Sequence, residues 1–116
     1  MHWERILSDI LEQIPKNESF SYRVFDCGVM DLGDAVQVTP KTLNILEGSY
    51  STHPELIGRY DLKIFLKTSP ETQSARILKR NGPARHKMFV EKWIPLENLY
   101  FTSYPVEKQC DLVFTT

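Results

Sequence analysis

A carboxylate followed by a glycine marks the first place where this sequence could do chemistry. Glu47 and Gly48 end the apolar run Leu43–Leu46, and this short run after Pro40 predicts a buried strand of a parallel sheet. Open α/β sheets bind ligands at the carboxyl ends of their strands, and glycine permits close approach. Glu47 could therefore hold Mg²⁺ through water. The alternative is that Glu47 simply ends a strand in solvent.

His53, in the polar loop that follows, is the second candidate. It stands beside Pro54 and Glu55, and could act as a general base or contact a substrate. No serine or cysteine lies at a recognisable catalytic spacing from it, and a lone loop histidine is more often structural.

A cluster of cations around a helix-breaking sequence is the third candidate. Asn81-Gly82-Pro83 interrupts a helical pattern, and basic residues flank it on both sides. A mobile basic lid of this kind could close over a polyphosphate and exclude water. The alternative is the solvated face of an ordinary helix. The five cations are Arg76, Lys79, Arg80, Arg85 and Lys87.

The elements before the central stretch are a helix and a hairpin. Apolar residues recur at helical spacing over His2–Ile14, and Pro15 ends that pattern. Alternation over Ser21–Phe25 and again over Ala35–Thr39, with glycines between them, predicts a β-hairpin.

The elements after the central stretch alternate between strand and helix. Leu62–Leu66 predicts a second buried strand, and the run Leu112–Thr115 predicts a third. Ser69 and Pro70 are suited to the N-cap and first position of a helix, which should turn Ala75, Ile77 and Leu78 inward. Met88–Ile94 predicts more helix, and Pro95 opens a further helical run.

Length and composition describe one globular domain, residues 1–116. Fourteen basic and fifteen acidic residues leave a net charge of −1, so we expect no nucleic-acid partner. No apolar stretch is long enough to span a bilayer, and the two cysteines suit reduced thiols, so a cytoplasmic location is expected, with no membrane partner.

Several of these sequences resemble the uridine-kinase-like P-loop kinases. Ile45–Leu56 resembles that family's strand and Glu-Gly loop with its His-Pro-Glu-Leu, and Tyr60-Asp61 with the next strand continues the similarity. Arg80-Asn81-Gly82, Pro95–Asn98 and Cys110–Val113 extend it over nearly the whole chain. No G-x-x-x-x-G-K-[ST] phosphate-loop motif occurs in the sequence.

The resemblance implies roles for particular residues. Glu47 would be the Mg²⁺ carboxylate, and Arg80 and Arg85 would bind ATP phosphates and stabilise the transferred group. Arg76 and His53 would contact the acceptor. Phe25 and Asp26 match the hairpin motif that covers the nucleoside, but Cys27 and Met30 depart from it, which leaves uridine or cytidine specificity open.

The fold that the resemblance implies is α/β: a partial three-layer P-loop NTPase with a mostly parallel sheet of three strands, a β-hairpin excursion and flanking helices. The family's phosphate-loop strand lies between the strands that Leu43–Leu46 and Leu62–Leu66 match. The two strands could pair directly, a second copy could fill the gap, or an upstream segment could belong to the native protein. We favour the upstream segment.

The expected function is that of the C-terminal part of an ATP-dependent kinase for a nucleoside or another small hydroxyl compound. ATP and Mg²⁺ are the implied cofactors, but without the phosphate loop we expect no turnover by this chain alone. The alternative is a non-catalytic remnant that binds a partner, or a second copy, through its open sheet.

Overall fold

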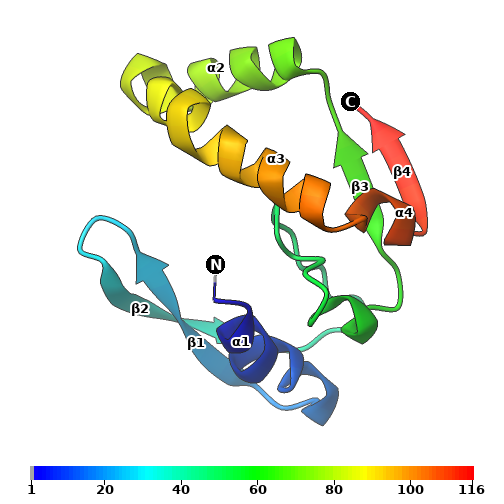
Figure 1. The fold of residues 1–116 in the computed structure, drawn as a ribbon. Coiled ribbons are helices and arrows are strands. Elements are labelled where there is room, and N and C mark those ends of the chain that lie inside the picture. Colours follow the sequence, from blue (N-terminus) through cyan, green and yellow to red (C-terminus); the bar gives the residue numbers. More distant parts are fainter. Residues whose placement is uncertain (1) are drawn as a thin grey trace. The chain divides into compact units, whose positions relative to one another are not determined.

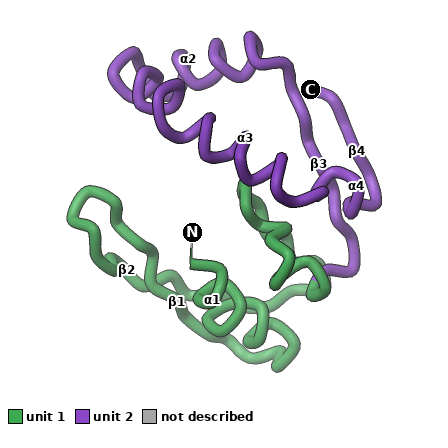
Figure 2. Tube along the Cα trace, viewed as in Figure 1, with its two compact units in different colours: residues 1–59 green, residues 60–116 purple. Residues whose placement is uncertain are grey.

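The computed structural model describes residues 2–116, which mix helices with two small sheets. The chain divides into two compact units, residues 1–59 and residues 60–116 (Figure 2). Each unit has its own elements and its own two-stranded sheet (Figure 1). The coarse expectation of an α/β chain is therefore confirmed. The three-stranded mostly parallel sheet is not present among the described residues.

Unit 1 contains the predicted N-terminal helix and the predicted hairpin. The helix runs as α1 (Trp3–Ile6) and continues as a π-helical segment, Leu7–Leu11. A short 3₁₀ turn, Ile14–Lys16, contains Pro15 and ends at Asn17 in the left-handed conformation. The hairpin pairs β1 (Phe20–Asp26) with β2 (Asp31–Val38) in antiparallel register.

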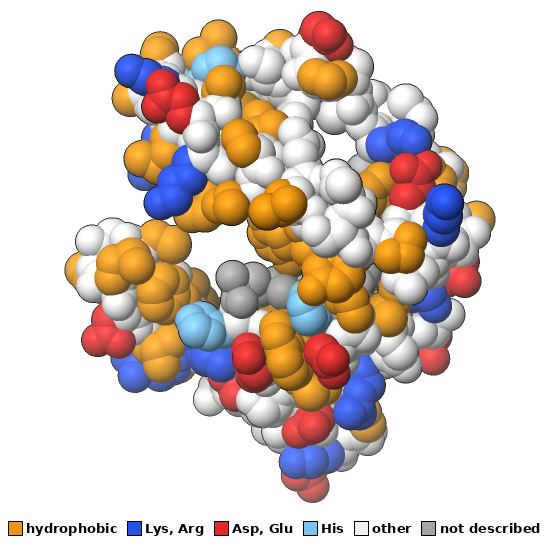
Figure 3. Space-filling view, in the orientation of Figure 1, with side chains coloured by type: hydrophobic (Ala, Val, Ile, Leu, Met, Phe, Trp, Pro, Cys, Tyr) orange, Lys and Arg blue, Asp and Glu red, His pale blue; other side chains and the backbone are white. Residues whose placement is uncertain are grey.

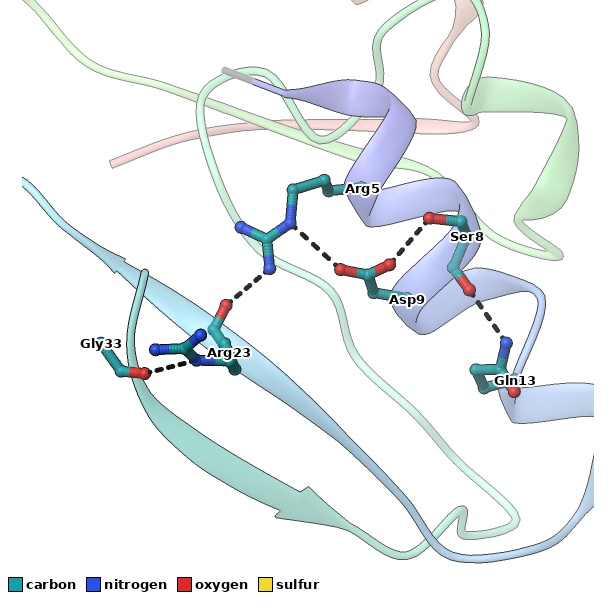
Figure 4. A network of polar contacts seen from close by, with 6 residues as sticks. All are labelled: Arg5, Ser8, Asp9, Gln13, Arg23 and Gly33. Atoms are coloured by element: carbon teal, nitrogen blue, oxygen red, sulfur yellow. Dashed lines mark hydrogen bonds and ion pairs between the residues drawn. The ribbon is translucent and has the colours of Figure 1, made fainter. Parts of the chain in front are cut away.

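A network of polar contacts ties the N-terminal helix to the hairpin (Figure 4). Arg5 pairs with Asp9 at 3.1 Å and donates a 2.8 Å hydrogen bond to the carbonyl of Arg23 in β1. Arg23 donates in turn across the hairpin to the carbonyls of Leu32 and Gly33. A guanidinium can bridge several acceptors because its donors form a planar fork. These two arginines are therefore structural residues of unit 1.

The predicted central strand at Leu43–Leu46 is wrong. Residues 39–47 have no strand pairing, and Leu43 and Ile45 are 75% and 82% exposed. A strand forms only where a neighbour takes up its backbone hydrogen bonds, and no described segment pairs with this one. Further along the chain, Leu56 is a buried apolar residue of unit 1, and a 3₁₀ turn, Ile57–Arg59, comes directly after it.

Unit 2 opens with the second predicted strand, and this prediction is confirmed. β3 (Ile64–Lys67) pairs in parallel with β4 (Leu112–Thr115), the predicted third strand. Between them lie α2 (Pro70–Met88), the π-helical segment Phe89–Trp93, α3 (Ile94–Ser103) and α4 (Val106–Gln109). The sheet of unit 2 therefore has two strands and two open edges.

The start of α2 is as its sequence predicts. The Ser69 hydroxyl accepts the backbone N–H of Thr72 at 3.1 Å, and Pro70 occupies the first turn. A capping side chain satisfies one of the N–H groups that a helix leaves unpaired at its start. Of the three residues expected to point inward, only Ile77 is buried, while Ala75 and Leu78 are exposed.

The core of unit 2 is small and gathers around α3. The Phe65 and Phe101 rings meet edge to face at 5.5 Å, so α3 covers one face of the β3–β4 sheet. Tyr100 lies against both Phe101 and Tyr104. The buried apolar residues of this unit are Ile77, Tyr100 and Val106.

Candidate functional site

Glu47 lies on an exposed loop rather than at a strand end. The turn that follows is held by Ser51, whose backbone N–H and hydroxyl both donate to the carbonyl of Gly48, at 3.1 and 2.9 Å. Gly48 has φ +152° and open space where a side chain would stand. The loop can therefore admit a ligand close to its backbone.

The carboxylate of Glu47 belongs to no cluster of three or more metal-ligating side chains in the described part of the chain. Among residues 2–116, no group of three or more His, Cys, Asp or Glu side chains is placed to hold a metal ion. Mg²⁺ takes one or two protein carboxylates and completes its shell with water and substrate phosphates. Glu47 alone therefore fits a Mg²⁺ ion that is bound mainly by a nucleotide.

His53 stacks on a tryptophan of the N-terminal helix. The His53 and Trp3 rings are stacked, with an angle of 9° between their planes and 5.6 Å between their centroids. The backbone N–H of Glu55 donates to His53 Nδ1 at 3.3 Å. Because one face and one nitrogen of the ring are engaged inside unit 1, His53 orders the loop that follows Glu47.

Phe25 and Asp26 stand at the end of the hairpin, as the sequence predicted. Phe25 is 40% exposed and lies opposite Leu32, and Asp26 lies opposite Asp31. Asp26 accepts the N–H of Gly28 at 2.7 Å, which closes the turn. Met30, where the resembled family has a histidine, takes a left-handed φ of +55°. The aromatic face of Phe25 is therefore available to a ligand at the hairpin tip.

The three arginines of the candidate lid all lie exposed on α2. Arg76 donates to the Thr116 hydroxyl at 2.9 Å, at the end of β4. Arg80 donates from Nε to the side chain of Asn81 at 2.8 Å. Arg76 and Arg80 are four residues apart and share one side of the helix, while Arg85 follows the break. The structure thus places the cations on both sides of a kink.

The kink occurs at Gly82, and Pro83, the next residue, causes it. Proline disfavours helical backbone in the residue before it, and Gly82 has φ +79° and ψ 172°, a conformation essentially restricted to glycine. Pro83 then begins the second helical segment, where its missing N–H costs nothing. The predicted break at Asn81-Gly82-Pro83 is confirmed.

The kink brings together two side chains that the sequence did not connect. The Ser74 hydroxyl and His86 Nε2 are 2.7 Å apart, and both residues are partly buried. In a straight helix, residues twelve apart would be separated by about 18 Å along the axis. The chain after Gly82 therefore folds back along residues 70–81 (Figure 1).

The sheet of unit 2 carries an uncovered apolar face, here called the bare face and formed by Ile64, Leu66, Leu112 and Phe114. Ile64 pairs with Leu112 and Leu66 with Phe114, so all four side chains share one side of the sheet. They are between 44% and 66% exposed. The charged residues are on the opposite side, where Lys67 pairs with Glu107 at 2.7 Å and Lys63 with Asp111 at 3.4 Å.

Exposed apolar surface is a property of both units (Figure 3). Exposed large apolar side chains include Val29 and Met30 in unit 1, at 70% and 73%, and Leu66 and Leu99 in unit 2, at 66% and 63%. Parallel sheets in proteins are almost always covered on both faces. The bare face was not predicted from sequence, because Leu62–Leu66 and Leu112–Thr115 both indicate buried strands.

The predicted site residues thus fall into two groups. Glu47, His53, Phe25 and Asp26 belong to unit 1, and the arginines belong to unit 2. Within unit 1, Glu47 and His53 share one loop, and Phe25 and Asp26 share the hairpin tip.

Comparison with known families and curated proteins identifies no relative of this chain. No family model matches the chain, and a search of curated proteins finds no match. Among the described residues, no helix has the length and apolar character needed to cross a membrane.

Proposed function

We propose that this chain is the acceptor and lid portion of an ATP-dependent phosphotransferase of the uridine-kinase-like class. It would act on a nucleoside or another small hydroxyl compound, with ATP and Mg²⁺ as cofactors. The observation that carries the proposal is the kinked α2, which exposes five cations between Arg76 and Lys87 on both sides of Gly82. Phosphoryl transfer depends on positioning and on neutralising the charge of the transferred group, and cations on a hinged segment supply both.

The remaining roles follow from where each side chain lies. Glu47, on an open loop, would bind the nucleotide's Mg²⁺ through water. The hairpin tip would offer Phe25 as an apolar surface and Asp26 as an acceptor for a hydroxyl of the substrate. His53 would contact the acceptor or support the loop beside it.

This activity requires a phosphate-binding loop from outside residues 1–116. The sequence contains no glycine-rich loop to surround a triphosphate with backbone N–H groups. The two-stranded sheet with its open edges is where a strand–loop–helix segment would add. The native protein, or a partner, would supply it.

Complementation tests the proposal. The chain would be mixed with a separately expressed strand–loop–helix segment bearing G-x-x-x-x-G-K-[ST], and transfer of labelled γ-phosphate from Mg-ATP to a panel of nucleosides would be followed. We expect no product from the chain alone and product from the mixture. Arg80→Gln with Arg85→Gln should lower kcat/KM at least about tenfold. Lys108→Gln, an exposed cation on α4, is the matched control and should have no effect.

Two results would contradict this function. Product formed by the purified chain alone would show that it needs no phosphate loop. Transfer by the mixture that is indifferent to both Arg80 and Arg85 would remove the lid from the mechanism.

A second function is favoured by the bare face: that of a module that binds another polypeptide or a second copy of itself. Four exposed apolar side chains on one sheet face, with no charge among them, are typical of an interaction surface. The two functions differ in what they require, because association needs no arginine on α2 and phosphoryl transfer does.

A further inference from the structure

The Ser74–His86 hydrogen bond joins the two helical arms on either side of Gly82. The first arm is residues 70–81 and the second arm is residues 83–88. Arg76 and Arg80 lie on the first arm and Arg85 on the second, so the way the arms fold back sets the spacing between their cations. The 2.7 Å bond is a side-chain contact that crosses the kink, and both of its partners are partly buried.

We propose that Ser74 and His86 form a latch that holds the two arms side by side, so that arginines of both arms act on one polyphosphate group. The inference rests on the proposed function and names two positioning residues for it. Neither side chain has to touch the anion. The latch would fix the backbone angle at Gly82, whose φ and ψ values are easily adopted only by glycine.

The physical reason for a latch lies in the kink itself. Gly82 has no side chain, and a Cβ built there would meet no atom within 4 Å, so no side chain at position 82 restrains the hinge. Pro83 removes a backbone donor, and the break in helical geometry interrupts the hydrogen-bond ladder between the arms. A side-chain hydrogen bond across the gap therefore has a large share in fixing the angle.

A serine beside an imidazole also suggests an activated nucleophile. Ser74 lies inside α2, where the neighbouring backbone N–H groups are used by the helix. Those groups cannot form an oxyanion hole, which acyl transfer requires. The pair is therefore better suited to holding structure than to attacking a carbonyl.

Substitution of Ser74 separates the latch from simple helix propensity. Alanine is the better helix former, so Ser74→Ala should strengthen the first arm if the hydroxyl has no role. Threonine keeps the hydroxyl but is a poorer helix former. The latch predicts the opposite order: the two arms should be held together in Ser74→Thr nearly as in wild type, and more loosely in Ser74→Ala.

The control is Ser103→Ala. Ser103 is also a helical serine, but its hydroxyl donates to the carbonyl of Leu99 within its own helix, at 2.8 Å. The single variant His86→Ala and the double variant Ser74→Ala with His86→Ala complete a cycle, in which two partners of one bond should not have additive effects.

Two measurements on the full chain test the proposal. Amide hydrogen exchange of residues 84–88 reports the hinge, and a titration with inorganic tripolyphosphate followed on the arginine Nε–H signals reports the anion site. We expect Ser74→Ala to speed exchange about threefold to tenfold and to weaken tripolyphosphate binding by a similar factor, as loss of one hydrogen bond predicts. Ser74→Thr and Ser103→Ala should do neither.

Each other outcome overturns a different statement. If Ser74→Ala exchanges like Ser103→Ala, no latch exists. If exchange rises but tripolyphosphate binding is unchanged, the latch does not position the arginines. If tripolyphosphate shifts no arginine signal of the wild-type chain, the proposed function of α2 fails, while the exchange data still decide whether the latch exists.

Discussion

Tyr60 and His53 show, at the scale of single residues, how local surroundings set side-chain chemistry. His53 is held by the Trp3 ring and by the N–H of Glu55, two contacts within its own unit. Burial raises the pKa of the Tyr60 phenol to about 12, with a smaller contribution from Tyr100. The Lys63 backbone N–H lowers the pKa of the Asp111 carboxyl, which it meets at 2.8 Å.

The Tyr60 phenol predicts how stability changes at high pH. Its folded-state pKa lies above the ordinary value of 10.0, so the folded protein holds the proton that the unfolded chain releases. The contribution of Tyr60 to stability is therefore fully present below pH 10 and declines from about pH 10 to 12. Urea unfolding of wild type and Tyr60→Phe across this range should show a steeper decline for wild type.

Tyrosinate absorbance provides a direct check of the same assignment. The late-titrating step should disappear in Tyr60→Phe and persist in Tyr22→Phe, which changes a half-buried tyrosine of β1. A late step that survives in Tyr60→Phe would assign the raised pKa to another phenol.

At the scale of elements, α2 behaves as two helices joined by a sequence-determined break. Ser69 caps the first arm, and Pro83 both opens the second arm and forces Gly82 out of the helical region. The hairpin is equally local, since Asp26 and Gly28 close its turn. These elements need little from the rest of the chain.

Gly82→Ala tests the cause of the kink. Alanine adopts φ +79° with ψ 172° only under strain, so the variant should be destabilised by about 1–3 kcal/mol. The strain is conformational, because no atom lies within 4 Å of the added Cβ. Gly58→Ala is the matched control, since its site is equally open and its φ lies outside the left-handed region. Chemical denaturation followed by circular dichroism measures both, and equal effects would contradict the strain argument.

At the scale of the whole chain, the main feature is that few large apolar residues are buried. Four are buried among the described residues, whereas the sequence is 41% hydrophobic. Apolar surface left in water contributes no stabilisation, and contiguous patches of it favour association. The bare face combines such a patch with two unpaired strand edges.

Leu66→Lys tests whether the bare face drives association. Leu66 is 66% exposed, so a lysine there should cost little stability while placing a charge on the bare face. We expect the sedimentation mass of wild type to rise with concentration and that of Leu66→Lys to stay monomeric. Val29→Lys, at a 70% exposed position on the hairpin turn, is the control and should behave as wild type. A wild-type mass that is independent of concentration would argue against self-association.

Most helices and strands could be predicted from the sequence, but the burial of their apolar residues could not. The N-terminal helix, the hairpin and the Ser69 cap depend on residues close in sequence, and all were predictable. The positions of both strands of unit 2 were also predicted, but their pairing joins residues 48 positions apart. The strand at Leu43–Leu46 was not, because apolar character alone cannot make a strand without a neighbour. The predicted burial of Ala75 and Leu78 was wrong for a similar reason, because helical spacing does not show whether another element covers that face of the helix.

The sequence by itself determined the helices, the hairpin, the break at Gly82-Pro83 and the five cations around it, because each of these depends on propensities and dihedral limits within a few residues. Only the tertiary structure decided that Ser74 meets His86, that β3 pairs with β4, and that one face of their sheet is uncovered. These features depend on contacts between residues 12 to 48 positions apart, and local preferences carry no information about such contacts.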